Sequence, residues 1–372
     1  MIAPLRRWWD RFRGGGEAGV TVPPMDGSLR PNRLLEEAPA VLTIKAPDNL
    51  ATDGRRVLFS SGNAVLKLEA DGKSFEVARF EHPVNALALA SDGTLAVGLG
   101  DGSVMVQGAA GERKLILGTG ERRFVCPTAL LFTASDELLI AQGSATLPAS
   151  EWRRDLMDRG ATGSVWLGSI ASGGVKLVAD RLSWPYGVGM TGGRIAITES
   201  WRHRIVTVDP KGGNITPVLE DLPGYPARLT PAGDAGWWLA VFAPRGQLIE
   251  FVQREPKFRA RMMAEVDPDH WVSPSLKPSS TFLEPLQGGA QKHLGMLKPW
   301  APTRSYGLVV KLDRQFRPVF SFHSRADGRR HGVTSCIEAG GRVLATSRGG
   351  DTIVQLDPAV AKPAAMPTEV SP

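Results

Sequence analysis

A strand–turn–strand unit recurs along this 372-residue chain and constrains the fold more than any other feature. Each copy holds a turn, a short apolar run, a polar or glycine-rich bend and a second apolar run that closes on a turn. Four uninterrupted copies occupy residues 54–73, 93–112, 192–213 and 340–359. Two interrupted copies join 136–143 to 163–170 and 236–243 to 306–313. The chain therefore carries six copies of one β-rich unit.

Repeats of about 40 residues, each worth three or four strands, are typical of β-propeller blades. A single blade leaves both faces of its sheet open to water, whereas a closed ring of blades buries these faces and removes exposed sheet edges. An open β-sandwich is the alternative, but it would not explain six similar units. The 42 glycines and 28 prolines suit short strands joined by many tight turns. We therefore predict an all-β protein, a six-bladed β-propeller.

The propeller is expected to occupy residues 22–360, between a basic amphipathic extension over 1–21 and a disordered tail over 361–372. Two segments that interrupt the repeats carry helical signals. In residues 148–160 a proline and a serine precede the predicted helix and a glycine ends the segment, as is typical of a short helix. Residues 245–304 place apolar side chains at helical spacing before a proline-rich stretch. An insertion of this length is either a functional lid or a packing element that covers one face of the propeller.

Composition narrows the choice of partners and compartment. The net charge is +6, but no long basic run and no recognised nucleic-acid module is present, so nucleic-acid binding is not expected. Two cysteines, Cys126 and Cys336, lie far apart and favour a reducing compartment, hence the cytoplasm. No stretch approaches 18 consecutive apolar residues. Residues 1–13 set apolar side chains at helical spacing opposite arginines, which fits a frayed basic tail or peripheral membrane contact.

Three motifs follow one another in a characteristic order, LSWPYGVGM (182–190), AITESWRHRIVTVD (196–209) and DLPGYPARL (221–229). In this order they resemble strictosidine synthase-like propellers, in particular the branch that contains adipocyte plasma membrane-associated protein. The likeness extends over most of residues 22–357. It implies a small-molecule pocket at one mouth of a central channel. Plant members join an amine to an aldehyde, whereas the related paraoxonases and gluconolactonases hydrolyse esters and lactones with an axial calcium ion.

The resemblance also implies where calcium ligands would stand, and most of them are replaced. Asp48 retains an acid, but Cys126, Tyr186, Ala227 and Arg228 occupy positions where the relatives carry asparagine or aspartate. Calcium prefers oxygen ligands, so a thiol, a methyl group and a guanidinium are unsuitable. We therefore expect no metal and no cofactor.

Alternatives to this expectation concern the alignment of the ligands and the role of Arg228. An alignment shifted by one residue would bring in Asn49 or Asn85 as ligands. The Arg228 guanidinium either neutralises Asp48 in place of the metal, or reaches solvent while Asp48 caps a turn.

Glu199 is expected to form ion pairs that fix a blade bend. Trp237 and Trp238, in an apolar strand run, are expected in the core.

The catalytic glutamate of the plant synthases aligns with Thr334, whose hydroxyl is not a usable general base at neutral pH. Strictosidine synthase activity is therefore not expected. Cys126 and His331 are the plausible nucleophile–base pair, with Asp48 as a further catalytic candidate, although Cys126 also suits a buried packing position. The candidate ligand-binding residues are Asn85, Tyr186, Arg228 and Thr334.

Two functions are compatible with these residues. The first is a propeller that binds a small organic ligand in an axial pocket, as a calcium-independent ester or lactone hydrolase. The second is a non-catalytic ligand-binding or protein-interaction propeller with a degenerate metal site, at the membrane surface if residues 1–13 attach there.

Overall fold

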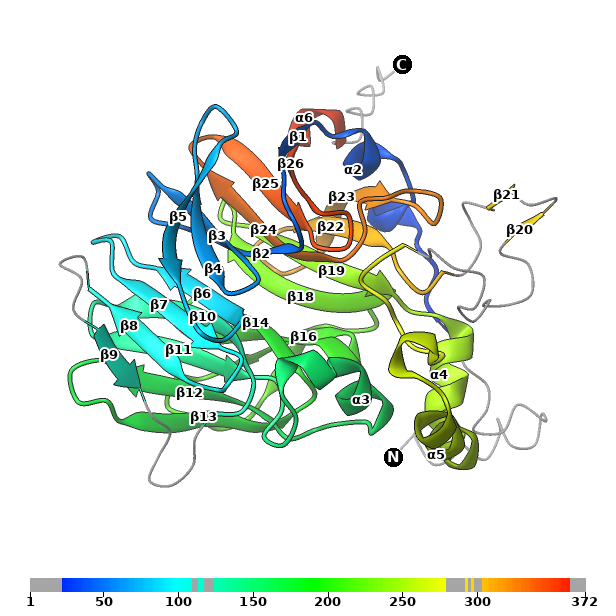
Figure 1. Ribbon diagram of the computed structural model, residues 1–372, viewed down its shortest axis with the longest axis horizontal. Helices are drawn as coiled ribbons and strands as arrows, with labels where there is room; N and C mark the ends of the chain where they lie inside the picture. Colours follow the sequence, from blue (N-terminus) through cyan, green and yellow to red (C-terminus); the bar gives the residue numbers. More distant parts are fainter. Residues whose placement is uncertain are drawn as a thin grey trace, which may run out of the picture.

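The computed structural model describes residues 22–108, 113–116, 124–278, 292–293, 296–297 and 303–361. Within these ranges, six four-stranded antiparallel sheets stand as blades around a common axis (Figure 1). The predicted six-bladed β-propeller is confirmed. The predicted extension and almost all of the predicted tail lie outside the described residues, as does the segment assigned to membrane contact.

The first three blades follow the chain, with the innermost strand of each named first. Blade 1 consists of β2 (Pro47–Thr52), β3 (Val57–Ser61), β4 (Ala64–Leu68) and β5 (Ser74–Arg79). Blade 2 consists of β6 (Val84–Leu89), β7 (Leu95–Leu99), β8 (Val104–Gln107) and β9 (Arg113–Ile116). Blade 3 consists of β10 (Pro127–Ala134), β11 (Glu137–Gln142), β12 (Gly163–Ser169) and β13 (Val175–Leu182).

The remaining blades have the same plan, and the last one takes its outermost strand from the start of the chain. Blade 4 consists of β14 (Pro185–Thr191), β15 (Arg194–Glu199), β16 (Arg204–Val208) and β17 (Thr216–Leu219). Blade 5 consists of β18 (Gly224–Pro231), β19 (Trp237–Pro244), β22 (Gly307–Leu312) and β23 (Pro318–Ser324). Blade 6 consists of β24 (Val333–Ala339), β25 (Arg342–Ser347), β26 (Thr352–Leu356) and β1 (Ala40–Thr43).

Strand β1 closes the ring, because it pairs antiparallel with β26 at the other end of the chain. The segment before it, with η1 (Gly27–Leu29) and α2 (Leu34–Glu37), runs along blades 5 and 6 (Figure 1). Leu35 is fully buried, and Glu36 Oε2 accepts a hydrogen bond from Ser324 Oγ at 2.6 Å. A last short helix, α6 (Pro358–Ala361), follows blade 6. These contacts join the two ends of the described chain.

Apolar faces of neighbouring blades form the core. Between blades 3 and 4, for example, Leu139, Val165 and Ile197 are fully buried in one cluster. Trp237 and Trp238 are buried, as predicted, and the Trp237 ring stacks on Phe316 with 5.4 Å between centroids. This packing fixes the blades, and with them the innermost strands at the axis.

The predicted bend of blade 4 is also confirmed. Glu199 is fully buried just before η3 (Ser200–Arg202). Its Oε1 lies 2.9 Å from Arg202 Nη1, and its Oε2 lies 2.6 Å from Arg204 Nη2. Two cations therefore neutralise one buried carboxylate and hold the turn.

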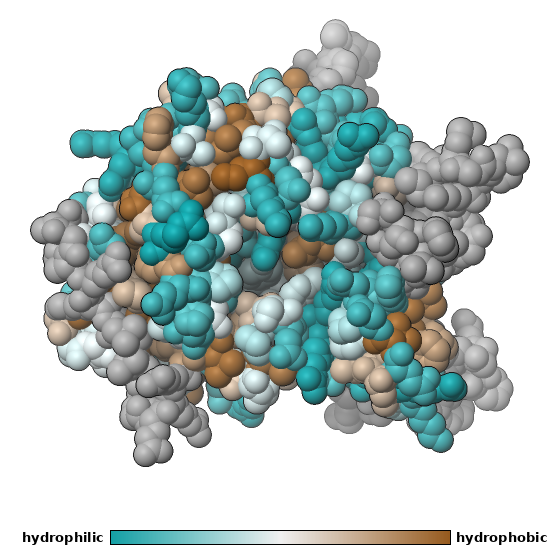
Figure 2. Space-filling view, viewed as in Figure 1, coloured by the Kyte–Doolittle hydropathy of each residue, from teal (hydrophilic) through white to brown (hydrophobic). Residues whose placement is uncertain are grey.

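The described parts of the insertions are mainly helical, with one short two-stranded sheet. Blade 3 carries η2 (Ala149–Glu151) and α3 (Trp152–Met157) between β11 and β12, which confirms the helix predicted over 148–160. Blade 5 carries α4 (Gln247–Arg254), α5 (Pro256–Glu265), η4 (Pro268–His270), β20 (Lys292–His293) and β21 (Met296–Leu297). Phe251 and Phe258 are exposed, and Figure 2 shows apolar surface near α4. No helix in the described ranges has the length and apolarity needed to span a bilayer.

Candidate functional site

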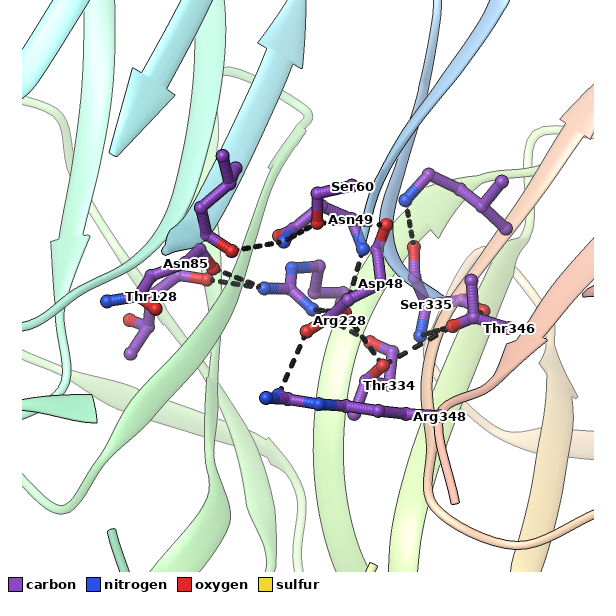
Figure 3. A network of polar contacts seen from close by, with 12 residues as sticks. Asp48, Asn49, Ser60, Asn85, Thr128, Arg228, Thr334, Ser335, Thr346 and Arg348 are labelled. Carbon is purple, nitrogen blue, oxygen red and sulfur yellow. Dashed lines mark hydrogen bonds and ion pairs between the residues drawn. The ribbon is translucent and has the colours of Figure 1, made fainter. Parts of the chain in front are cut away.

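The innermost strands of the six blades converge at the axis, where they bring polar residues together (Figure 3). Strands β2, β10 and β14 each begin with a proline, which suits a first strand position because proline cannot donate a ladder hydrogen bond. The polar residue follows directly after the proline in these strands. The hub residues are Asp48 of β2, Asn85 of β6, Thr128 of β10, Tyr186 of β14, Arg228 of β18 and Thr334 of β24.

The Arg228 guanidinium lies at the centre of this hub and is almost completely buried. Its Nη1 donates to Asp48 Oδ1 at 2.6 Å and to the Thr334 carbonyl at 3.3 Å. Its Nη2 donates to the carbonyls of Asn85, at 2.8 Å, and Thr128, at 3.1 Å. The predicted ion pair between Arg228 and Asp48 is present, and the alternative of a solvent-exposed Arg228 is wrong. One side chain thus ties four innermost strands to its own.

Asp48 receives more hydrogen bonds than a carboxylate needs for neutralisation alone. Thr334 Oγ1 donates to its Oδ1 at 2.7 Å, as does the Asn49 backbone NH at 2.7 Å. Arg348 Nη1 donates to its Oδ2 at 3.2 Å. Burial by itself raises the pKa of the Asp48 carboxyl, but Arg228 and Arg348 outweigh this effect and hold that pKa below its ordinary value. Asp48 is therefore an ionised, fully occupied carboxylate and a weak base.

These residues do not fit a calcium ion of the kind the resemblance implies. Calcium binds carboxylate and carbonyl oxygens, and here those of Asp48, Asn85 and Thr128 already accept hydrogen bonds from Arg228. A divalent cation would also meet the guanidinium charge at contact distance. In the described part of the chain, no three His, Cys, Asp or Glu side chains gather as metal ligands would.

A cavity of about 370 Å³ opens above the hub, with Asp48, Asn85 and Thr128 in its floor. Tyr186 also borders it, and the Arg228 Cζ lies 4.9 Å from the centre of the Tyr186 ring, a cation–π contact. Its other walls come from blade 3, blade 4, blade 5, the insertions and the bend after β25. These walls include Trp152, Trp184, Trp201, Phe242, Leu276 and Arg348, and blade 2 adds His82, Pro83 and Gly100.

Arg348 is the cation of the hub that lines this cavity. Its side chain remains 41% exposed although one guanidinium nitrogen bonds to Asp48. Asp48 supplies one negative charge, whereas Arg228 and Arg348 supply two positive charges. The floor of the cavity therefore carries one excess positive charge.

The predicted pair of Cys126 and His331 is not formed, and this expectation is wrong. Both side chains are fully buried, but the His331 ring lies between Ser305 Oγ, 2.8 Å from Nδ1, and the Arg325 carbonyl, 2.9 Å from Nε2. No ring nitrogen is left to accept a proton from a thiol. Burial raises the pKa of the Cys126 thiol to about 12, so this sulfur is a packing group rather than a nucleophile.

Three contributors were missed by sequence reasoning. Thr128 acts through its backbone carbonyl, which any residue type would provide. Arg348 reaches the hub from the bend between β25 and β26, a direction that no local pattern encodes. His82 has a side chain that is 48% exposed, yet it borders the cavity, with Nε2 3.7 Å from Asp101 Oδ2.

No family model matches the sequence, and no curated protein matches it. Solved structures do match. A gluconolactonase from Xanthomonas campestris has a TM-score of 0.55 at 12% identity, over 87% of this chain and 88% of that protein. A luciferin-regenerating enzyme has a TM-score of 0.52 at 13% identity, over 90% of this chain and 96% of that protein. At such identities the likeness establishes a shared six-bladed fold.

Proposed function

We propose that the axial cavity binds a small organic molecule whose carboxylate or carbonyl oxygen is held by Arg348. The observation that carries this proposal is the charge of the hub, where two guanidinium groups face the single carboxylate of Asp48. The excess positive charge lies on Arg348, the partly exposed member of the trio. A guanidinium presents donors in a planar fork that matches a carboxylate.

The walls of the cavity select the rest of the ligand. Trp184 and Trp201 are stacked with 5.1 Å between ring centroids, and Phe242 lies edge-on to Trp201. Aromatic walls with a few convergent polar groups are typical of sites for small organic molecules, and the volume is of the usual size. The proposed ligand is therefore a compact apolar molecule with one anionic or carbonyl end. Asn85, Tyr186 and Thr334 complete the polar floor, directly or by positioning Asp48.

Replacement of Arg348 by methionine tests this proposal. Arg348→Met keeps much of the side-chain volume but removes the charge, so binding of 3-phenylpropionate should weaken at least tenfold by calorimetry. Arg342→Met, at the start of the strand β25 that Arg348 follows, is the matched control and should bind like the wild type. Equal affinities for both variants, or no binding by the wild type, would contradict the proposal.

A second candidate is hydrolysis of a lactone or ester without calcium, for which His82 is the specific observation. Its imidazole borders the cavity beside Asp101, which is placed to orient the ring. Neutral His82 would accept a proton from a water molecule while the water oxygen adds to the ester carbonyl. Arg348 would stabilise the oxyanion, the ester C–O bond would then break, and the leaving oxygen would take up the proton. The products are an acid and an alcohol, joined in one hydroxy acid for a lactone.

Hydrolysis of phenyl acetate and γ-nonalactone, with and without a chelator, distinguishes the two candidates. For an enzyme of this kind the rates are unaffected by the chelator and fall about 100-fold or more in His82→Ala. His270→Ala, on η4, is the control. Strict dependence on calcium would overturn the assignment of the hub. Rates equal to those without protein would leave the non-catalytic binding function.

A further inference from the structure

A second cavity, of about 700 Å³, lies further along the same six innermost strands. Arg228 lines this second cavity, while its hydrogen-bond partners Asp48, Asn85 and Thr128 line the axial cavity described above. The Arg228 layer therefore separates two cavities along one channel. None of the residues proposed to bind or transform a ligand in the axial cavity, other than Arg228, lines the second one.

The walls of the second cavity are mainly apolar. Leu89 and Leu131 are partly exposed within it, and Met190 is 38% exposed. Gly189 lets the wall pack closely against a tryptophan ring. A Cβ atom added there would lie 2.7 Å from Cζ3 of Trp237, which forms part of the wall. A concave apolar surface of this kind is costly to leave in water.

The ionisable groups that line this cavity give it a negative rim. They are the carboxylates of Asp92 and Glu338, since the charge of Arg228 is matched by Asp48. Glu338 Oε2 accepts from Trp238 Nε1 at 3.2 Å and from the Gly233 NH at 3.1 Å. Among the described residues, no donor bonds to its Oε1.

The buried cation beside Trp238 does not cancel this negative charge. Lys311 Nζ lies 5.6 Å from the centre of the Trp238 ring and 2.7 Å from Asp234 Oδ1. It therefore has its own carboxylate partner. The second cavity thus combines apolar walls with unneutralised negative charge, whereas the axial cavity combines aromatic walls with positive charge.

We propose that the second cavity binds an amphipathic cation, an apolar molecule with one ammonium group held by Glu338. The apolar body would lie between the aliphatic side chains of the innermost strands, where its burial drives binding. The ammonium would donate to Glu338 Oε1, the carboxylate oxygen that accepts no other hydrogen bond. This site is independent of the function proposed for the axial cavity.

Calorimetry with 4-phenylbutylamine as the probe tests the proposal. The uncharged analogue is 4-phenylbutanol. The anionic analogue is 4-phenylbutyrate, which is measured on Arg348→Met so that the axial cavity does not hold its carboxylate. The amine should bind at least tenfold more tightly than either analogue, because a charge-assisted hydrogen bond is lost in both. Glu338→Gln should remove this preference, and Glu69→Gln, on the exposed turn after β4, should not. Salt should weaken binding of the amine to the wild type.

Two further variants keep the result interpretable. Ala90→Trp narrows the cavity from a partly exposed position and should weaken binding of 4-phenylbutylamine and 4-phenylbutanol. Arg348→Met alters only the axial cavity and should leave amine binding unchanged. Thermal unfolding of each variant confirms that it is folded. The proposal is overturned if 4-phenylbutanol binds as tightly as the amine, if Glu338→Gln has no effect, if the amine does not bind, or if Arg348→Met abolishes its binding.

Discussion

Arg228→Met is expected to lower the free energy of unfolding by about 3–5 kcal/mol, the range found when one partner of a buried ion pair is removed. Arg228 and Asp48 are both less than a tenth exposed, with 2.6 Å between Nη1 and Oδ1. Methionine would leave the carboxylate with Arg348 as its remaining cation. It would also leave the inward-facing carbonyls of Asn85 and Thr128 without their donor. Chemical denaturation measures the loss.

Two controls separate the effect of burial from that of charge. Arg33→Met removes a cation from Asp327 in a pair that is partly exposed, with 2.9 Å between Nη1 and Oδ2, and should cost much less stability than Arg228→Met. In the double variant Asp48→Asn/Arg228→Met the buried carboxylate is gone, and the cation that remains, Arg348, is partly exposed to solvent. The double variant should therefore be more stable than Arg228→Met alone. If Arg228→Met costs no more than Arg33→Met, the Arg228 layer does not hold the innermost strands together.

The pH dependence of stability tests the Arg228–Asp48 ion pair independently. The pKa of Asp48 is lower in the folded protein than in the unfolded chain, where an aspartate has a pKa of about 3.9. The pair therefore contributes stability above that value, and this contribution is lost as the pH falls through the folded pKa. The stability difference between the wild type and Arg228→Met should consequently shrink below about pH 4.

The ring of blades could be predicted from the sequence because each blade is a local repeat. Apolar runs, bends and turns such as those of residues 54–73 and 340–359 specify their own hairpins through neighbours in the chain. The closing strand could not be found in this way. Residues 40–43 form a single short strand, and their partner β26 lies about 310 positions away. Because this strand is not part of a strand–turn–strand repeat, the repeat pattern does not predict the pairing.

The hub was predictable only in part, for a related physical reason. Asp48 stands at the start of β2 and Arg228 lies within β18, and the repeat brings both of these innermost strands to the axis. Cys126 precedes its strand by one residue and faces the core rather than the axis, where Thr128 contributes instead. His331 also precedes its strand, and both of its ring nitrogens have partners outside the hub. A shift of one or two residues at a strand start therefore separates a site residue from a packing residue.

The second large effect is expected far from the axis, in the segment that precedes the closing strand. Leu35, on α2, is fully buried in the largest apolar cluster, which also contains Phe322 of β23 and Val354 of β26. It packs so closely that a Cβ atom added at Gly307 would lie 2.8 Å from its Cδ2. Blades 5 and 6 thus share this side chain across the point where the ring closes.

Leu35→Ala should therefore lower the free energy of unfolding by about 2–5 kcal/mol, the cost of deleting a buried leucine side chain and leaving a cavity. Glu37→Ala, two residues later on the same short helix, removes an exposed side chain and should change stability by less than about 0.5 kcal/mol. Denaturant titration of both variants gives the comparison. Equal stabilities would mean that α2 contributes nothing to the stability of the propeller. A large difference would show that α2 helps to hold blades 5 and 6 together, as the burial of Leu35 requires.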